Sequence, residues 1–536
     1  MRGLDSTSRR DARAPIRRAT PSDRPPSARA PTWPDIFSRA KSCDGILMNL
    51  KNLGASYGLL ALASLLPGNS AQAAQPQAAT PALTGQTEHL PAYDARPRLI
   101  VITDIANEPD DEASLVRLLL YADSFDIEGL IASTSIWMRD AVHPEKIEER
   151  VRAYGAALPN LKVHSPGYPS MERLLSRISS GEPLYGMKAV GEGHDTAGSR
   201  AIIEAVDRAD NGRPVWVSIW GGSNVLAQAL WRVSHDRPPE QVADFVSRLR
   251  VYSISDQDDS GPWLRQTFPK LFWIASLHAF NHYERATWTG ISGEAFYKFE
   301  GGPDARLVSK EWLTQNIIKG PLGSLYPLPA FIMEGDTPAF LYLIPNGLGV
   351  PEAPDFGSWG GRYGRLGAGL SIWTDVSDTA LGQDGRQHSE AQASIWRWRD
   401  AYQGDFAARM QWTLAPQYKG ANHAPIIRIG KDRGLVPVER ELVAGQQLRL
   451  DLSGTRDPDG DAISLSCWQY KEPSTTSVST ARVPTLSIEK CTDREIVLTA
   501  PAVKMPTLLH LIVEARDDAQ LTMRSYRRVI VRVSPG

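Results

Sequence analysis

Four oxygen-bearing side chains, those of Asp104, Asn107, Asp110 and Asp111, follow a run of branched apolar residues at 99–102. The run has the length and composition of a buried parallel strand, and an amphipathic helix is expected directly after the acids. Open α/β sheets bind their ligands at the carboxyl ends of the strands. Carboxylate and amide oxygens are the ligands that hard cations such as Ca²⁺ prefer. The spacing therefore predicts a calcium site at the end of a first strand.

A simpler interpretation of Asp110 and Asp111 is that they cap the following helix and favour its positive end. Capping needs one acid, however, and it accounts for neither Asp104 nor Asn107. The residues alone leave both interpretations open.

Further segments follow in an order that is similar to one known group of proteins. The segments are Thr-Asp-Ile-Ala-Asn-Glu-Pro-Asp-Asp-Glu (103–112), Leu-Leu-Leu-Tyr-Ala-Asp (118–123), Ile-Glu-Gly-Leu-Ile-Ala-Ser-Thr-Ser (127–135), Trp-Gly-Gly-Ser-Asn-Val-Leu-Ala-Gln-Ala-Leu (220–230), Glu-Gly-Asp-Thr-Pro-Ala-Phe-Leu-Tyr-Leu-Ile-Pro-Asn-Gly-Leu (334–348) and Trp-Gly-Gly-Arg-Tyr-Gly (359–364). The first resembles the Asp-x-Asp-Pro-Gly-x-Asp-Asp calcium motif of the nucleoside-hydrolase superfamily. The set, spread over about residues 95–536, resembles the bacterial cellulose-binding proteins that carry a nucleoside-hydrolase-like domain.

This resemblance implies a Ca²⁺ ion held by Asp104, Asp111, the backbone carbonyl of Ser223 and Asp336. It also implies that Asp104 is the general base of a glycosidic hydrolysis, taking a proton from a metal-bound water. Asp110 would then lie nearer the sugar hydroxyls. Structural alternatives remain for two of these residues: a Gly-Gly-Ser-Asn turn is an ordinary helix start, and Asp336 can be a helix N-cap.

Five residues are candidate substrate contacts. Asn107 and Asn224 lie beside the expected metal ligands in the sequence. Asp258 and Asp259 follow another expected strand, where they could contact sugar hydroxyls or belong to a solvated acidic turn. Trp359 lies in a Gly-rich segment and could form an aromatic floor for a base or sugar, or simply pack the loop.

The sequence departs from the superfamily pattern at several points. Ile102 stands where the first Asp of Asp-x-Asp is expected, and two additional residues separate Asp104 from Asp110. Gly335 precedes Asp336 at a place where many nucleoside hydrolases carry a histidine near the leaving base. The acid that protonates the leaving group is therefore unassigned. Its candidates, each of which could equally be a surface or structural residue, are His194, His278 and His282.

Two functions of different classes follow. The first is an exported, calcium-dependent hydrolase of N-glycosyl (ribosyl-type) or related glycosyl bonds, acting on a nucleoside or another glycoside. The alternative is a non-catalytic protein that binds cellulose or another plant polysaccharide and reuses the nucleoside-hydrolase fold. Charge is nearly balanced, with 59 Lys and Arg against 61 Asp and Glu. No basic field therefore indicates a nucleic-acid partner, and the composition does not predict an oligomeric state.

The pattern after residue 96 predicts an α/β fold with a mainly parallel sheet and helices on both faces, because strand-like and helix-like segments alternate. The expected strands are Leu99–Thr103, Ile127–Ser133, Leu161–Ser165, Val215–Trp220, Leu249–Ile254 and Leu271–Ala275. The expected helices are Ala113–Tyr121, Glu145–Ala157, Ser199–Ala209, Val225–Val233 and Pro239–Leu249. Residues 340–415 are rich in Gly, Trp and Pro and are expected to be irregular structure at the sheet's edge.

From about residue 427 the pattern becomes all-β, which predicts an immunoglobulin-like β-sandwich after a linker at 416–426. The expected strands are Gln447–Leu452, Ile463–Trp468, Glu495–Thr499, Leu508–Ala515 and Arg528–Val533. The string 457–461 (Asp-Pro-Asp-Gly-Asp) could bind Ca²⁺ or be an ordinary turn. Cys467 and Cys491 lie in this domain, where an oxidising compartment would permit them to pair.

The N-terminal part is expected to be a leader and not a folded domain. Residues 1–47 hold ten Lys or Arg against five Asp, with few large apolar residues, so they are expected to be disordered and possibly not translated. Met48 opens a basic start, an apolar core and an Ala-x-Ala site, which together are typical of a signal peptide at 48–73. A linker at 74–95 precedes the α/β domain at 96–415. The protein is therefore expected in the periplasm or outside the cell, and without a membrane span.

Overall fold

The computed structural model describes residues 96–536 except 209, 211, 279, 293–300, 433 and 476–478. The predictions for the leader, the signal peptide and the first linker lie outside the described residues.

The first domain is built on an eight-stranded sheet with the order β3-β2-β1-β4-β5-β6-β8-β7. All neighbouring strands are parallel except β7 and β8. The strands are β1 (Arg98–Thr103), β2 (Asp126–Ala132), β3 (Ile178–Ser180), β4 (Val215–Ile219), β5 (Leu249–Ser255), β6 (Phe272–Ser276), β7 (Tyr363–Arg365) and β8 (Ile372–Asp375). The expected mainly parallel sheet is confirmed.

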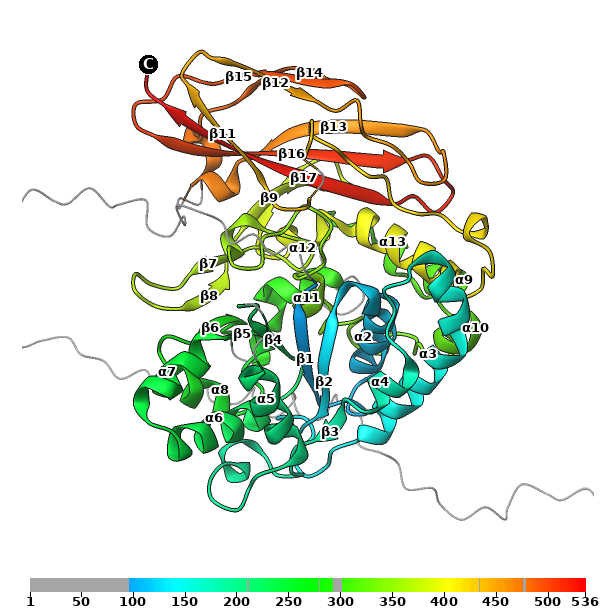
Figure 1. The fold of residues 1–536 in the computed structure, drawn as a ribbon, viewed down its shortest axis with the longest axis vertical. Coiled ribbons are helices and arrows are strands. Elements are labelled where there is room, and N and C mark those ends of the chain that lie inside the picture. The colour runs from blue at the N-terminus through cyan, green and yellow to red at the C-terminus, as the bar shows by residue number, and fades with distance from the viewer. Residues whose placement is uncertain are drawn as a thin grey trace, which may run out of the picture. The chain divides into compact units, whose positions relative to one another are not determined.

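Helices cover both faces of this sheet (Figure 1). Along β1, Leu99 and Val101 enter one hydrophobic cluster with helices α2, α3 and α13, whereas Ile100 and Ile102 enter a second cluster with α5 to α8. Side chains of a strand alternate between faces, so an entirely apolar strand needs cover on both sides. The helices are α2 (Pro109–Leu120), α3 (Pro144–His164), α4 (Met171–Leu175), α5 (Ala197–Asp207), α6 (Asn224–Asp236), α7 (Pro239–Ser247), α8 (Ser260–Thr267), α9 (Lys310–Asn316), α10 (Gly320–Gly323), α11 (Thr337–Leu341), α12 (Ala393–Trp396) and α13 (Arg399–Trp412).

The predicted strand Leu161–Ser165 is wrong, because helix α3 continues through it to His164. Pro159 lies inside this helix, where proline removes a helix hydrogen bond. The buried stripe of Tyr154, Ala157, Leu161 and His164 nevertheless keeps helical spacing across the proline. Packing of this stripe outweighs the local cost, and the strand beside β2 is the short β3 instead.

The segment 340–415 is more regular than expected. It contributes β7 and β8 to the sheet edge, a hairpin of β9 (Asp378–Leu381) and β10 (Gln387–Glu390), and the helix α13. Helix α13 buries residues on several sides, among them Arg399, Gln403 and Asp405. Its polar residues are therefore not on an exposed face, and this hides the helical periodicity from a reading of the sequence.

The C-terminal domain is a sandwich of a four-stranded sheet, β11-β17-β16-β13, and a three-stranded sheet, β12-β15-β14, visible as two layers in Figure 1. Its strands are β11 (Val438–Val443), β12 (Gln447–Asp451), β13 (Ile463–Tyr470), β14 (Ser487–Cys491), β15 (Glu495–Thr499), β16 (Thr507–Asp517) and β17 (Arg524–Ser534). The expected β-sandwich is confirmed, and β11 and β14 are additional to the predicted strands.

The middle strands of the four-stranded sheet, β16 and β17, are buried on both faces along most of their length. Leu509, Leu511 and Val513 of β16 enter the core between the two sheets, whereas Ile512 belongs to the main cluster of the first domain. Arg528 of β17 is fully buried and donates to the backbone oxygens of Leu348, Phe356 and Gly357 in the first domain. Burial lowers the pKa of Arg528 to about 10. The sandwich is therefore packed into the α/β domain and is not a tethered module.

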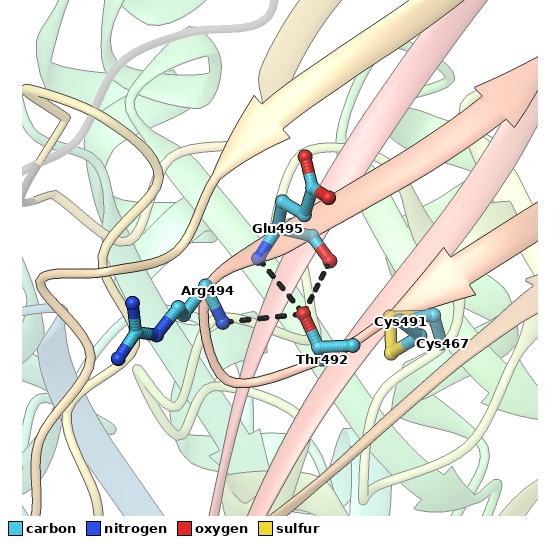
Figure 2. The surroundings of a disulfide bond; sticks show 5 residues. All are labelled: Cys467, Cys491, Thr492, Arg494 and Glu495. Carbon is cyan, nitrogen blue, oxygen red and sulfur yellow. Dashed lines mark hydrogen bonds between the residues drawn. A yellow bond between two sulfur atoms is a disulfide. The ribbon is translucent and has the colours of Figure 1, made fainter.

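A disulfide joins Cys467 of β13 to Cys491 of β14, with 5.9 Å between the Cα atoms (Figure 2). The next turn is held by Thr492, whose hydroxyl accepts the backbone N–H groups of Arg494 and Glu495 and donates to the Glu495 carbonyl. Strands β13 and β14 are edge strands of different sheets. The bond therefore closes one side of the sandwich.

Replacing both cysteines by serine is expected to lower the free energy of unfolding by about 3 kcal/mol, because the bond closes a loop of roughly 25 residues in the unfolded chain. Chemical denaturation of the full chain measures this change. A reductant should destabilise the wild type by the same amount and leave the double variant unchanged. A wild type that is indifferent to the reductant would contradict the prediction.

Candidate metal and sugar site

The acidic residues meet at the point where the strand order of the sheet reverses, between β1 and β4. The carboxyl ends of strands form a crevice at such a point. Asp104 follows β1 directly and is 3 % exposed. A Cβ atom on Gly221, just after β4, would lie 2.7 Å from Asp104 Oδ1. Glycine at this position therefore lets the two strand ends approach each other.

Asp110, Asp111 and Asp336 are buried together. Each offers a carboxylate oxygen, and these oxygens lie within 4.8 Å of one another. Asp110 and Asp111 come from the first turn of α2, and Asp336 is the residue before α11. Asp104 is not in this group of three, but its charge raises the pKa values of all three members.

Burial is the main cause that raises the pKa values of the cluster, and repulsion between carboxylates adds to it for every member except Asp104. The pKa of Asp104 rises to about 6, and the half-buried Glu108 reaches about 7 because of burial and the charge of Asp104. The pKa values of Asp110, Asp111 and Asp336 lie well above the usual range. Every charge that shifts these five groups is another carboxylate of the cluster. A cation is the natural partner of such a set.

The donor set suits a hard divalent cation. All its side chains offer oxygen, and Asp336 Oδ2 is buried without a hydrogen-bond partner among the described residues. Thr103 Oγ1 donates to Asp111 Oδ1, which fixes the direction of that carboxylate. A buried acceptor left unpaired costs free energy, so the orphaned oxygen of Asp336 is better explained by a ligand than by packing.

A buried ion pair holds the two acid-bearing elements together. Arg117 of α2 and Glu334, two residues before Asp336, are both fully buried, with 2.7 Å between Nε and Oε2. Tyr326 also donates to Glu334 at 2.6 Å. Ala106 and Glu334 have positive φ angles of 85° and 54°. Strained non-glycine residues cluster at functional sites, and both of these lie in loops that carry the acids.

The structure places Ser223 and Asn224 at the start of α6. The Ser223 carbonyl accepts the Ala227 amide at 3.0 Å, as in any helix, and its role as a metal ligand stays a prediction. Asn224 is 1 % exposed and donates to Thr134 Oγ1 and to the Leu184 carbonyl. Its side-chain oxygen is buried without a partner among the described residues.

The other predicted contacts are partly engaged within the protein, and Asp258 Oδ2 is buried without a hydrogen-bond partner among the described residues. Asp258 accepts the Ser260 amide and hydroxyl, and Asp259 accepts the Met187 amide at 2.8 Å. Asn107 is half-buried, and its backbone N–H donates to the backbone carbonyl of Asp104 at 3.3 Å.

Trp359 is 1 % exposed, and its indole N–H donates to the Tyr526 hydroxyl of β17. The structure therefore places this ring at the contact between the domains, where its surroundings agree with the packing alternative.

Each candidate histidine for the leaving group has a carboxylate partner. The pairs are His194 with Glu182 at 2.7 Å, His278 with Asp375 at 3.2 Å and His282 with Glu284 at 3.2 Å. Asp375 raises the pKa of His278.

Sequence reasoning missed three groups that face the acids. These are Glu108, the Ser135 hydroxyl, which hydrogen-bonds Asp104, and Tyr283, whose hydroxyl lies 2.9 Å from Ser255 Oγ and whose pKa the charges of Asp104 and Glu108 help to raise. Glu108 was visible in the motif as a replacement for glycine. Ser135 ends the motif at 127–135, but nothing in that motif assigned it a role. Tyr283 carried no local signal, because only the tertiary fold brings it to the acids.

Comparison with known proteins identifies the family. Residues 98–363 match the model of the cellulose-binding Sde182 nucleoside hydrolase-like domain, and residues 447–533 match the C-terminal domain of cellulose-binding protein Sde0182. A solved structure is similar over 82 % of this chain and 100 % of its own, with 33 % identity and a TM-score of 0.69. The chain belongs to the Sde182 cellulose-binding family.

That solved structure is described as a nucleoside hydrolase-related hypothetical protein from Saccharophagus degradans that is associated with carbohydrate metabolism. A search of curated proteins finds no match. The expected fold classes, an α/β fold followed by an all-β sandwich, are confirmed by the fold and agree with the order of the two matches.

Proposed function

We propose that this protein is an exported, calcium-dependent hydrolase of N-glycosyl (ribosyl-type) or related glycosyl bonds, with Asp104 as its general base. The observation that carries the proposal is the cluster of Asp104, Asp110, Asp111 and Asp336, buried together at the strand-order reversal with an unpaired carboxylate oxygen on Asp336 among the described residues. A purely structural role would leave this negative charge uncompensated.

Asp111 and Asp336 would hold the ion, together with Asp104 and the Ser223 carbonyl. When bound, Ca²⁺ supplies positive charge that orients sugar hydroxyls and makes a nearby water more acidic. Asp104 lies at the end of β1, and the Ser135 hydroxyl hydrogen-bonds its carboxylate. It is therefore positioned to accept the proton of the attacking water while the glycosidic bond breaks toward the leaving group. Asp110 would contact the sugar hydroxyls.

Export is supported by the disulfide between Cys467 and Cys491, since such bonds persist in oxidising compartments. Across the part of the chain that the structure describes, no helix combines the length and apolar character that a membrane crossing needs.

The second candidate is a non-catalytic carbohydrate-binding protein. It is favoured by the family description, cellulose-binding, and by the solved relative's association with carbohydrate metabolism. A shared fold is weak evidence for a shared reaction. Both candidate functions therefore have to be tested directly, in one experiment on this protein.

The deciding experiment is a panel of nucleosides and aryl glycosides, assayed with Ca²⁺ and with a chelator, beside pull-downs on cellulose and xylan. Release of a base or aglycone only with Ca²⁺ supports the hydrolase. If no glycoside is cleaved and the protein is pulled down on cellulose or xylan, the non-catalytic binding function is supported instead.

A pH dependence of calcium stabilisation also follows from the cluster. Folded-state pKa values above the unfolded ones mean that the acids favour folding at low pH, and this contribution is lost as pH rises from about 4 to 6 for Asp104. The added calcium should therefore raise Tm more at pH 7.5 than at pH 5.

Thermal unfolding of the full chain with Ca²⁺ or with a chelator measures the difference, and Asp111→Asn should reduce it. Equal calcium shifts at both pH values would contradict the expectation.

A further inference from the structure

A cavity of about 260 Å³ lies where the sandwich, the α/β domain and the linker between them meet. Arg409 comes from α13, Ile426 from the linker, and Ser525 and Arg527 from the first residues of β17. None of the described residues that line it belongs to the acidic cluster. A single water needs about 10–15 Å³, so the cavity is large enough for a small organic molecule.

Arg527 is buried at this cavity with its hydrogen bonds incomplete. It is 1 % exposed, and its Nη2 donates to the Val436 carbonyl at 3.1 Å and lies 3.1 Å from Asp432 Oδ1. The Nε and Nη1 groups have no hydrogen-bond partner among the described residues. Buried N–H groups of a guanidinium cost free energy when they are left unpaired. An anion in the cavity would supply the missing acceptors.

Further donors line the same cavity. The Nδ2 group of Asn346, the hydroxyl of Ser525 and Nε of Arg524 are also buried without a partner among the described residues. Asn346 Oδ1 accepts the Leu348 backbone N–H at 3.0 Å, which fixes the end of the side-chain amide that is left unpaired. Ser525 and Arg527 are two residues apart on β17 and therefore share a face of the strand. The unpaired side-chain atoms among the described lining residues are thus all able to donate a hydrogen bond.

The backbone holds these donors in place. The Tyr526 N–H donates to the Asn346 carbonyl at 2.9 Å. Gly347, with φ 86°, lies against the Tyr526 carbonyl oxygen, and a Cβ atom at this position would clash with it. The loop that carries Asn346 is therefore bound directly to the strand that carries Ser525 and Arg527. Donors that are fixed in this way lose little conformational freedom when a ligand binds.

The charge at the cavity favours an anion. Among the described lining residues the charged ones are Arg409, Arg524, Arg527 and Asp405. Asp405 Oδ1 already accepts the Tyr121 hydroxyl at 2.6 Å and Arg409 Nε at 2.9 Å. Arg409 and Arg524 are also paired with acids outside the cavity, so Arg527 has the largest unmet demand. Guanidinium, amide and hydroxyl donors are the groups that bind carboxylates and phosphates.

The apolar part of the lining distinguishes between these anions. Ile426 and Leu435 line the cavity and are 37 % and 42 % exposed. A ligand that covers them removes apolar surface from water, which stabilises the complex. Inorganic phosphate has no apolar surface to cover them. A carboxylate with an apolar body satisfies the donors and covers these side chains as well.

We propose that this cavity is a binding site for a small organic carboxylate. Its carboxylate would accept hydrogen bonds from Arg527, Asn346 and Ser525, and its apolar body would lie against Ile426 and Leu435. The ligand would then contact the α/β domain, the linker and the sandwich together, so its binding should stabilise the docked arrangement of the two domains.

Calorimetric titration of the full chain with benzoate tests the site. Arg527→Gln should weaken benzoate binding by about tenfold or more, because charge-assisted hydrogen bonds are lost. The matched control is Arg532→Gln, which removes a guanidinium that β17 carries outside the cavity, where it pairs with Glu439. Benzyl alcohol has the same ring without the charge and should bind the wild type about tenfold more weakly than benzoate, or weaker still.

Asn346→Asp tests the site without removing the buried arginine. One carboxylate oxygen can still accept the Leu348 N–H, and the other brings a negative charge into the cavity in place of the ligand's own. Benzoate affinity should fall by about tenfold or more, whereas Tm of the ligand-free protein should not fall. Thermal unfolding with and without benzoate measures both effects.

Each outcome decides for or against the site. Benzoate binding that is weakened in Arg527→Gln and in Asn346→Asp, and kept in Arg532→Gln, supports it. No benzoate binding by the wild type overturns it, and so do equal affinities for benzoate and benzyl alcohol. Binding of inorganic phosphate without binding of benzoate also overturns it, because the ligand would then not be an organic carboxylate. A loss in Arg532→Gln as large as that in Arg527→Gln overturns the location.

Discussion

Hydrolysis of a ribosyl-type substrate is expected to fall by about 10²–10⁴-fold when Asp104 is replaced by asparagine, the usual contribution of a general base. Asparagine keeps the size of the side chain and can still pair with the Ser135 hydroxyl. It cannot accept the proton of the attacking water, so with Ca²⁺ raised to saturate the weakened ligand set the loss should appear in kcat. Steady-state kinetics with and without Ca²⁺ measures kcat and KM.

A matched control for Asp104→Asn is Asp207→Asn, a half-exposed aspartate at the end of α5 that pairs with Arg237. Its kinetics should equal those of the wild type. Hydrolysis by Asp104→Asn at the wild-type rate would remove Asp104 from the mechanism, even if calcium still binds.

Calcium affinity is expected to fall by about 100-fold or more in Asp336→Asn, because a charged oxygen ligand from a separate element is lost. The same change should stabilise the calcium-free protein at pH 7.5. Asp336 is 1 % exposed, and the charges of Asp111, Asp110 and Asp104 repel it. A variant that binds calcium more weakly but is more stable without calcium indicates a metal ligand. Replacing a purely structural aspartate would not give this combination.

Asp258→Asn is the control for the loss of calcium affinity in Asp336→Asn. Asp258 is also buried, and burial raises its pKa to about 6, but it accepts the Ser260 amide and hydroxyl. Its replacement should leave calcium affinity unchanged. Calorimetric titration with Ca²⁺ and thermal unfolding with a chelator read the two quantities. Wild-type calcium affinity in Asp336→Asn would contradict the site.

The sequence predicted those parts of the fold whose signal is local. The apolar run of β1, the turn to α2 and the alternating strands of the sandwich follow from periodicity and turn residues. The predicted strand at Leu161 was wrong because burial of an extended helical stripe outweighs Pro159. Helix α13 was missed because its polar side chains are buried against other elements.

The candidate site likewise contains residues that a local motif predicts and residues that only the tertiary fold brings together. Asp104, Asp110 and Asp111 lie in one motif, and the family resemblance pointed to Asp336, which the structure brings beside them. The ion pair of Arg117 with Glu334 and the Ser135 contact link residues far apart in the chain. No local pattern encodes such pairs, since each partner alone looks like an ordinary helix or loop residue.

The position of β17 determines when the four-stranded sheet of the sandwich can form. This strand lies between β11 and β16, pairing in parallel with one and antiparallel with the other, yet it is synthesised after both. Until Arg524–Ser534 has emerged, β11 has no partner in its sheet, and Arg528 cannot reach the carbonyls of the α/β domain. Folding of the sandwich and its docking on the α/β domain are therefore completed together, by the same strand.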